Sequence, residues 1–181
     1  MLTESERRDL LALARRAVDA KVRREPAPPL PDQPGLRRPA GAFITLTALS
    51  ELRGCIGYPE ADQPLAAVVV RCAALAASED PRFPPVTPGE LVSLRIELSV
   101  LGPVEPVTDP SVIVVGRDGL IVEQGLRRGL LLPQVAIEWG WDRDALLAHT
   151  CQKAGLPPDA WRTGARVFKF AADVFHEPDD R

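Results

Sequence analysis

The segment Val92-Ser93-Leu94-Arg95-Ile96-Glu97-Leu98-Ser99-Val100 alternates apolar and polar residues along its whole length. This period of two is typical of a β-strand that buries one face and leaves the other in contact with water. Strands of this kind occur mainly in antiparallel sheets, because parallel sheets are usually covered on both faces. We therefore expect an antiparallel sheet with one covered face.

The chain before this sheet begins with a predicted helix over residues 3–24. Thr3 and Glu6 have the spacing of a capping box, and apolar residues recur after them at helical spacing. Residues 26–39 then contain too many prolines for a helix or a sheet interior, which predicts an extended connector on the surface. The main body of the protein follows over residues 41–176.

The first part of the main body is expected to form a strand, a turn, a second strand and a helix. The strands cover residues 41–49 and 52–57, and the helix runs from Pro64 to about Ser78, with Asp62 or Gln63 as its cap. This helix is apolar almost all round, so it should be buried, and Cys72 within it is most simply a core residue.

The second part repeats this order of elements. Residues 112–115 and 120–123 are predicted strands joined by a turn at 116–119, and residues 129–132 form a third short strand. Two helices follow, one over residues 133–139 and one capped by Asp142, before a last strand at 167–175. The mixture of hairpins and helices without strict alternation indicates an α+β fold, which we expect to form a single domain over residues 1–181.

Composition excludes several classes of protein. A formal net charge of −3 and an isoelectric point near 5.5 argue against binding to nucleic acid through a broad basic surface. We find neither an apolar run of the ~18 residues that a membrane span needs nor a signal-peptide pattern. Three cysteines without a CxxC pair fit a reducing compartment, so we expect a cytoplasmic protein. Arginine outnumbers lysine and the chain has 19 prolines, which suggests a GC-rich bacterial genome.

The segment Leu52-Arg53-Gly54-Cys55-Ile56-Gly57 carries the clearest candidate for chemistry. On an extended backbone Arg53 and Cys55 point to the same face, where a guanidinium favours the thiolate form of the cysteine. The two glycines allow another backbone or a ligand to approach closely. Two interpretations stay open, a reactive thiol and an inert buried cysteine, because cysteine is among the most buried residue types.

Five blocks of sequence, in this order over nearly the whole chain, resemble the AMMECR-one domain family, and specifically its bacterial members called AmmeMemoRadiSam system protein A. The blocks are Leu52–Gly57, Asp80–Pro85, Gly129–Val135, Glu138–Trp141 and Lys153–Leu156. The resemblance implies an α+β fold with two related halves around a barrel-like sheet. It also implies a role beside a Memo-type protein and a radical S-adenosylmethionine protein. The chain has no CxxxCxxC motif, so it is not itself the radical enzyme.

The shared blocks supply the candidate site residues. We expect Cys55 to be a nucleophile and Glu138 an acid or base. We expect a small anionic substrate to be bound by Arg53, Arg82, Gln134 and Lys153. The Asp80–Pro85 loop should then pack close to the Leu52–Gly57 segment. The rival interpretation is a non-catalytic adaptor that docks on the two partner proteins.

Other features point to no further chemistry. His149 and Cys151 offer two metal ligands, but no second pair has zinc spacing, so we expect no metal site and no cofactor. Trp139 and Trp141 are interpreted as anchors in the core or between the two halves. His149 and His176 both lie outside the shared blocks, so a cysteine–histidine dyad has no support from the sequence. The sequence does not predict an oligomeric state.

Overall fold

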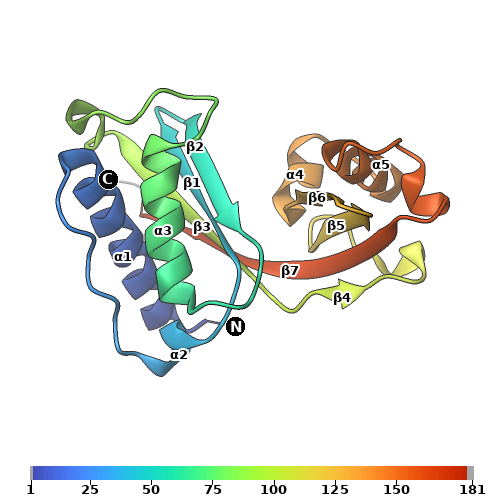
Figure 1. The fold of residues 1–181 in the computed structure, drawn as a ribbon, viewed down its shortest axis with the longest axis horizontal. Helices are drawn as coiled ribbons and strands as arrows, with labels where there is room; N and C mark the ends of the chain where they lie inside the picture. The colour runs from blue at the N-terminus through green and yellow to red at the C-terminus, as the bar shows by residue number, and fades with distance from the viewer. Residues whose placement is uncertain (1, 179–181) are drawn as a thin grey trace. The chain divides into compact units, whose positions relative to one another are not determined.

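The computed structural model describes residues 2–178, which divide into two compact units (Figure 1). The first unit contains the chain up to Leu101 and the segment from Asp173 onward, and the second contains Gly102–Ala172. The last strand, β7 (Arg166–His176), contributes its beginning to the second unit and its end to the first. The single domain over residues 1–181 with two related halves stays a prediction.

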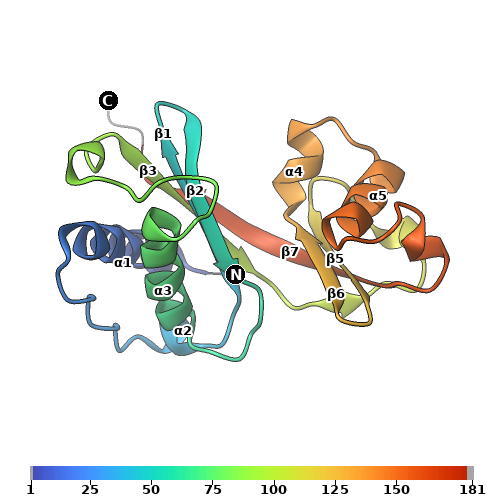
Figure 2. The same cartoon turned by 45° about the horizontal axis from the view of Figure 1, so that its top comes forward.

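The first unit is an antiparallel sheet covered by helices. Its strands are β1 (Ala42–Ala48), β2 (Glu51–Tyr58) and β3 (Leu94–Leu101), in the order β2-β1-β3 with the end of β7 beside β3. The helices α1 (Glu4–Arg23) and α3 (Leu65–Ser78) lie side by side against one face (Figure 2). The alternation of β3 is confirmed, since Leu94, Ile96 and Leu98 are fully buried beneath these helices.

Local sequence explains where these helices begin. The capping box of α1 is confirmed, because the Thr3 hydroxyl accepts a hydrogen bond from Glu6 N–H at 3.2 Å and the Glu6 carboxylate accepts one from Thr3 N–H at 2.7 Å. The prediction of a cap for α3 at Asp62 or Gln63 is wrong, because the N-cap position is occupied by Pro64 without a side-chain hydrogen bond. The proline-rich connector is extended as predicted, apart from one short helix, α2 (Pro34–Arg37), which begins at a proline.

The second unit has its own sheet and its own core. Strands β5 (Asp118–Gln124) and β6 (Arg127–Leu131) form a hairpin, and the beginning of β7 pairs with β5 and with the short strand β4 (Glu105–Pro106). Helices α4 (Pro133–Glu138) and α5 (Arg143–Lys153) pack on this sheet. Asp142 caps α5 as predicted, since its carboxylate accepts a hydrogen bond from Ala145 N–H at 2.8 Å.

The predicted hairpin of residues 112–115 and 120–123 is wrong. Residues Pro110–Val112 form a short 3-10 helix, whose preceding Asp109 accepts a hydrogen bond from Ser111 N–H. The buried carboxylate of Asp118 then accepts one from Val114 N–H at 2.9 Å, which holds residues 114–118 in a turn. The observed hairpin turns instead between β5 and β6, where Gly125 has a φ of +61° that glycine adopts without strain. Both units nevertheless combine antiparallel strands with helices, and the α+β class is confirmed.

Candidate active site

The free edge of β2 in the first unit is covered by the loop that follows α3. The backbone N–H of Cys55 donates a hydrogen bond to Asp80 Oδ2 at 2.8 Å, and Arg82 Nη2 donates one to the carbonyl oxygen of Cys55 at 3.4 Å. These side chains satisfy backbone groups that an edge strand otherwise leaves open. The prediction that the Asp80–Pro85 loop packs against the Leu52–Gly57 segment is therefore confirmed.

Asp80 and Arg82 form an ion pair beside the Cys55 backbone, in which the carboxylate is buried and the guanidinium is partly exposed. Arg82 donates from Nε and Nη2 to the two carboxylate oxygens of Asp80, at 2.9 and 2.7 Å, and only 2% of the Asp80 side chain is exposed. The hydrogen bonds from Arg82, together with those from the N–H groups of Cys55 and Arg82, lower the pKa of Asp80 far below its usual range. The same pair raises the pKa of Arg82, so both groups stay charged at neutral pH.

Arg53 holds the far end of the same loop. Its Nε donates to Glu90 Oε1 at 2.7 Å, and its Nη1 and Nη2 donate to the carbonyl oxygens of Pro84 and Pro85 at 2.9 and 3.3 Å. The Arg53 hydrogen bond is the main reason that the pKa of Glu90 falls to about 2. The pairing of β1 with β2 shifts at Arg53, which forms a bulge and interrupts the strict alternation assumed for Arg53 and Cys55. The guanidinium bonded to the Cys55 backbone is that of Arg82.

Glycine at position 54 determines which way Cys55 faces. A Cβ at Gly54 would lie 2.2 Å from the carbonyl oxygen of Ala76, so β2 packs directly against α3 at this residue. The side chain of Cys55 therefore points to the opposite face of the sheet, away from α1 and α3. There the thiol is half-buried, and the hydroxyl of Thr45 on β1 lies 3.4 Å from Cys55 Sγ, within hydrogen-bonding distance for sulfur.

The other two cysteines are poor candidates for chemistry. Cys72 is 1% exposed in the core of the first unit, and burial raises the pKa of its thiol to about 11. Cys151 is fully buried in the second unit, and burial raises its pKa as well. Because the thiolate is the nucleophile, both are expected to react slowly at neutral pH.

The sheet places two further groups in line with Cys55 that the sequence analysis did not select. Thr45 pairs with Cys55 on one side and with Glu97 of β3 on the other. Backbone hydrogen bonds from Glu177 N–H to the carbonyl oxygen of Ile96, and from Gly102 N–H to that of Ala171, set the register of β3 and β7. In this register His176 lies opposite Glu97, so one row crosses four strands of the first unit in the order Cys55, Thr45, Glu97, His176.

The remaining predicted site residues belong to the second unit. Gln134 and Glu138 lie on α4, half-buried and exposed respectively, and Lys153 is exposed at the end of α5. Their grouping with Cys55, Arg53 and Arg82 stays a prediction. The interpretation of Trp139 as a core residue is wrong, because it is 70% exposed. Trp141 packs on the core of the second unit and stacks on His149, with 3.9 Å between the ring centroids.

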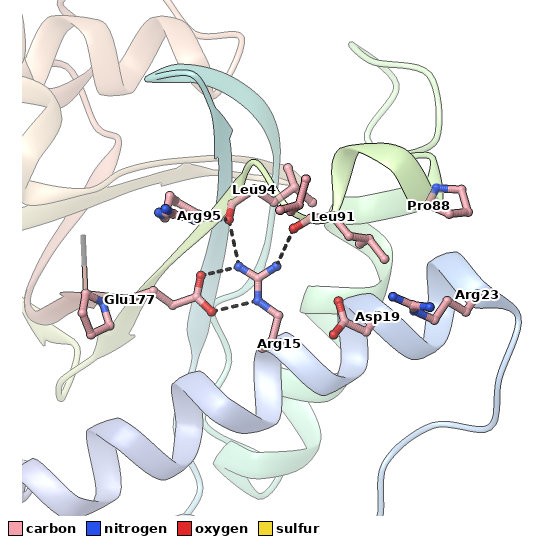
Figure 3. Close-up of a pocket in the computed structure, with 10 residues that line it drawn as sticks. Arg15, Asp19, Arg23, Pro88, Leu91, Leu94, Arg95 and Glu177 are labelled. Atoms are coloured by element: carbon pink, nitrogen blue, oxygen red, sulfur yellow. Dashed lines mark hydrogen bonds and ion pairs between the residues drawn. The ribbon is translucent and has the colours of Figure 1, made fainter. Parts of the chain in front are cut away.

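A separate hollow of about 530 Å³ lies in the first unit beside α1 (Figure 3). Arg15 crosses it and donates to the carboxylate of Glu177 and to the carbonyl oxygens of Leu91 and Leu94. Asp19 and Arg23 line its rim. Arg15 thus joins α1 to the chain around β3, which is a structural role. Within residues 2–178 no group of three or more His, Cys, Asp or Glu side chains is arranged to hold a metal ion.

Comparison with known proteins agrees with this fold. The AMMECR1 family model matches residues 11–175. The chain belongs to the AMMECR1 family. A protein of Methanothermobacter thermautotrophicus is 49% identical over 185 residues, covering 97% of this chain and 96% of that protein. The crystal structure of the uncharacterized protein PH0010 from Pyrococcus horikoshii superposes with a TM-score of 0.89 at 44% identity, covering 93% of this chain and 90% of that one.

Proposed function

We propose that this AMMECR1-family protein is a cysteine-dependent enzyme that acts on a small anionic substrate, with Cys55 as its nucleophile. The observation that carries the proposal is the environment of Cys55. The residue is half-buried, its backbone is held by the Asp80–Arg82 pair, and its sulfur lies beside the Thr45 hydroxyl. A fixed thiol with a polar neighbour and a permanent cation nearby is the arrangement that nucleophilic catalysis needs.

Arg82 supports the choice of an anionic substrate. Its Nε and Nη2 are bonded to Asp80 and to the backbone of Cys55, while its side chain is still 54% exposed. Within the described part of the chain, its Nη1 donates no hydrogen bond and is available to a carboxylate or phosphate. Gln134, Glu138 and Lys153 are the groups that we expect the second unit to contribute to the same substrate.

The wider setting of the reaction is proposed from the sequence blocks alone. We place the protein in the cytoplasm, as the bacterial AmmeMemoRadiSam system protein A, in a pathway with a Memo-type protein and a radical S-adenosylmethionine protein. The relatives named above are archaeal, and nothing in their names refers to such a pathway. Within residues 2–178 no helix is both long enough and apolar enough to cross a bilayer.

Complementation of a deletion strain, read together with its metabolite profile, tests the enzyme proposal. We expect Cys55→Ser and Arg82→Ala to leave the deletion profile unchanged, with the same small anion accumulating in each. Cys72→Ser is the matched control, because it changes the same chemical group in the core of the same unit. Full restoration of the wild-type profile by Cys55→Ser would rule out the enzyme.

An adaptor is the second candidate, and a specific surface favours it. Ile137 and Trp139, at the end of α4, are 63% and 70% exposed, which is unusual for large apolar side chains. If docking is the function, Trp139→Ala should reduce co-purification of the Memo-type or radical protein. The variant should leave the reactivity of Cys55 unchanged. Loss of co-purification together with full complementation by Cys55→Ser would favour the adaptor.

A further inference from the structure

The row of side chains behind Cys55 has the composition of a proton path. Thr45 Oγ1 and Cys55 Sγ are 3.4 Å apart, and Thr45 is paired directly with Glu97 on the next strand. Side chains that pair directly across antiparallel strands have Cβ atoms about 4.5–5.5 Å apart, so a glutamate can reach a threonine hydroxyl there. Cys55, Thr45 and Glu97 are all half-buried, which limits the access of water to the path.

The hydrogen-bonding pattern of the strands brings the two outer pairs of the row close, while Thr45 and Glu97 between them form a hydrogen-bonded pair with the wider spacing. The N–H and carbonyl of Cys55 point outward to Asp80 and Arg82, so Cys55 and Thr45 form a non-hydrogen-bonded pair. In antiparallel sheets the side chains of such pairs are the closer ones. The same alternation makes the pair of Glu97 and His176 a close one, and His176 is exposed at the outer end of the row.

We propose that Thr45 relays the proton of the Cys55 thiol to Glu97, and that His176 passes it to solvent. The inference rests on the proposed function, since it names the base of the same site. When the sulfur attacks, the S–H bond breaks and its electron pair stays on sulfur to form the new bond. The proton goes to Thr45 Oγ as the hydroxyl proton of Thr45 goes to the carboxylate of Glu97. Threonine is thus regenerated, and Glu97 becomes neutral.

Thr45 and Glu97 have opposite effects on the ionisation of the Cys55 thiol. The Thr45 hydroxyl stabilises the thiolate by donating a hydrogen bond to it. The negative charge of Glu97 disfavours a second negative charge on Cys55, although Glu97 is the group that accepts the proton. The other charged or titratable groups around this row are Asp80 and Arg82, which bond the backbone of Cys55, Arg95 of β3, and His176 of β7 at the outer end. They are unchanged in the variants of Thr45 and Glu97.

The test measures alkylation of Cys55 by iodoacetamide between pH 6 and pH 10, read by peptide mass spectrometry on the full-length protein. We expect Thr45→Val to raise the midpoint of the pH profile by about one unit, which slows alkylation about tenfold at pH 7. Thr45→Ser should restore the wild-type midpoint, because it restores the hydroxyl. Glu97→Gln should lower the midpoint and speed alkylation, yet fail to complement a deletion strain. Thr47→Val is the control on the same strand.

Each result has a defined meaning. No shift with Thr45→Val, or shifts of Thr45→Val and Glu97→Gln in the same direction, would overturn the relay. If Cys55→Ser complements the deletion, the enzyme proposal fails, while opposite shifts still establish the coupling of Cys55, Thr45 and Glu97. If Cys55→Ser does not complement and the opposite shifts are absent, the relay alone is wrong.

Discussion

In both units a glycine lets a strand pack closely against a helix, but the residues beside the two glycines differ in their chemistry. In each unit a hairpin is followed by helices, and the second hairpin strand carries a glycine packed against one of them, α3 in the first unit and α5 in the second. A Cβ at Gly54 of β2 would lie 2.2 Å from Ala76 O, and one at Gly129 of β6 would lie 2.4 Å from Ala154 N. The common part, close packing of strand on helix, is a requirement of the fold.

The residue after each glycine marks the difference between the units. In the first unit it is Cys55, with Asp80 and Arg82 bonded to its backbone. In the second unit it is the apolar residue Leu130. The Asp80 carboxylate is buried while Arg82 is 54% exposed, and a buried carboxylate is costly to desolvate unless it is paired. The second unit has a similar ion pair, Arg117–Asp118, but its cysteine, Cys151, is fully buried, so the half-buried thiol beside the pair is the reason to assign function to the first hairpin.

The largest loss of stability is expected from adding a side chain at either glycine. Gly54→Ala and Gly129→Ala each force a backbone atom to move, and we expect each to cost about 3 kcal/mol of unfolding free energy. Gly89→Ala is the control, because nothing lies within 4 Å of a Cβ there. Urea denaturation of the three variants measures the difference. If only one of the first two variants is destabilised, the two hairpins are not equivalent.

Removal of the Asp80 charge should be the next largest effect. Asp80→Asn keeps the shape but weakens the hydrogen bonds from Arg82 and the Cys55 N–H, at a cost of about 2 kcal/mol at pH 7. The pKa of Asp80 is lower in the folded protein than its unfolded value of about 3.9, so its stabilising effect is complete above that value. It declines as the pH falls below about 4.

The pH dependence gives this prediction its control. The difference in unfolding free energy between wild type and Asp80→Asn should be constant from pH 5 to pH 8 and become smaller from pH 4 to pH 2. A difference that is the same at pH 2 and pH 7 would show that the charge of Asp80 contributes nothing to stability.

Serine in place of cysteine should affect the two units differently. Cys151 is fully buried in the second unit, so Cys151→Ser places a hydroxyl in the core and should cost about 1.5 kcal/mol. Cys55 is half-buried on a polar face, and Cys55→Ser should cost about 0.5 kcal/mol. Thermal melts of both variants check the order. A larger loss in Cys55→Ser would identify Cys55 as a structural residue and weaken the enzyme proposal.

The parts of the fold that the sequence predicted are those with a local cause. Thr3 and Asp142 cap their helices because a cap needs only the residues within one turn. The hairpin of the second unit was misplaced because its position depends on the Asp118 side chain, which holds the preceding turn through Val114. The alternation of apolar and polar residues does not reveal such a hydrogen bond between a side chain and the backbone, because the bond exists only once the turn has formed.

The sequence predicted the cysteine-containing motif of the candidate site but not the residues that neighbour it across the sheet. Cys55 and Arg82 were found because their blocks stand out in the sequence. Thr45 and Glu97 were missed because their pairing with Cys55 depends on strand register. A shift of one residue in register moves every side chain to the other face, and the bulge at Arg53 changes the register within the same strand. The alternating pattern of β3 did indicate that Glu97 lies on the polar face.

The smallest expected effect is the difference in unfolding free energy between two arginine variants. Arg53 holds a loop in the first unit, whereas Arg166 lies on the surface of the second. Arg53 is 14% exposed, and its guanidinium bonds Glu90 and two carbonyl oxygens. Arg166 is 72% exposed, pairs with Glu123 and lies over the Phe168 ring. We expect Arg53→Ala to cost about 1 kcal/mol, because it leaves partly buried acceptors without their donor. Arg166→Ala should cost about 0.5 kcal/mol or less, as exposed ion pairs do.

The same pair of variants also tests what Arg53 does for the site. Arg53→Ala should release the loop near Pro84 and Pro85 and increase hydrogen exchange at the Cys55 amide, which is bonded to Asp80 in the same loop. Arg166→Ala should leave that amide unchanged. If Arg53→Ala abolishes complementation while stability and exchange stay at wild-type levels, Arg53 binds substrate directly. Unchanged complementation with faster exchange would instead limit its role to holding the loop over β2.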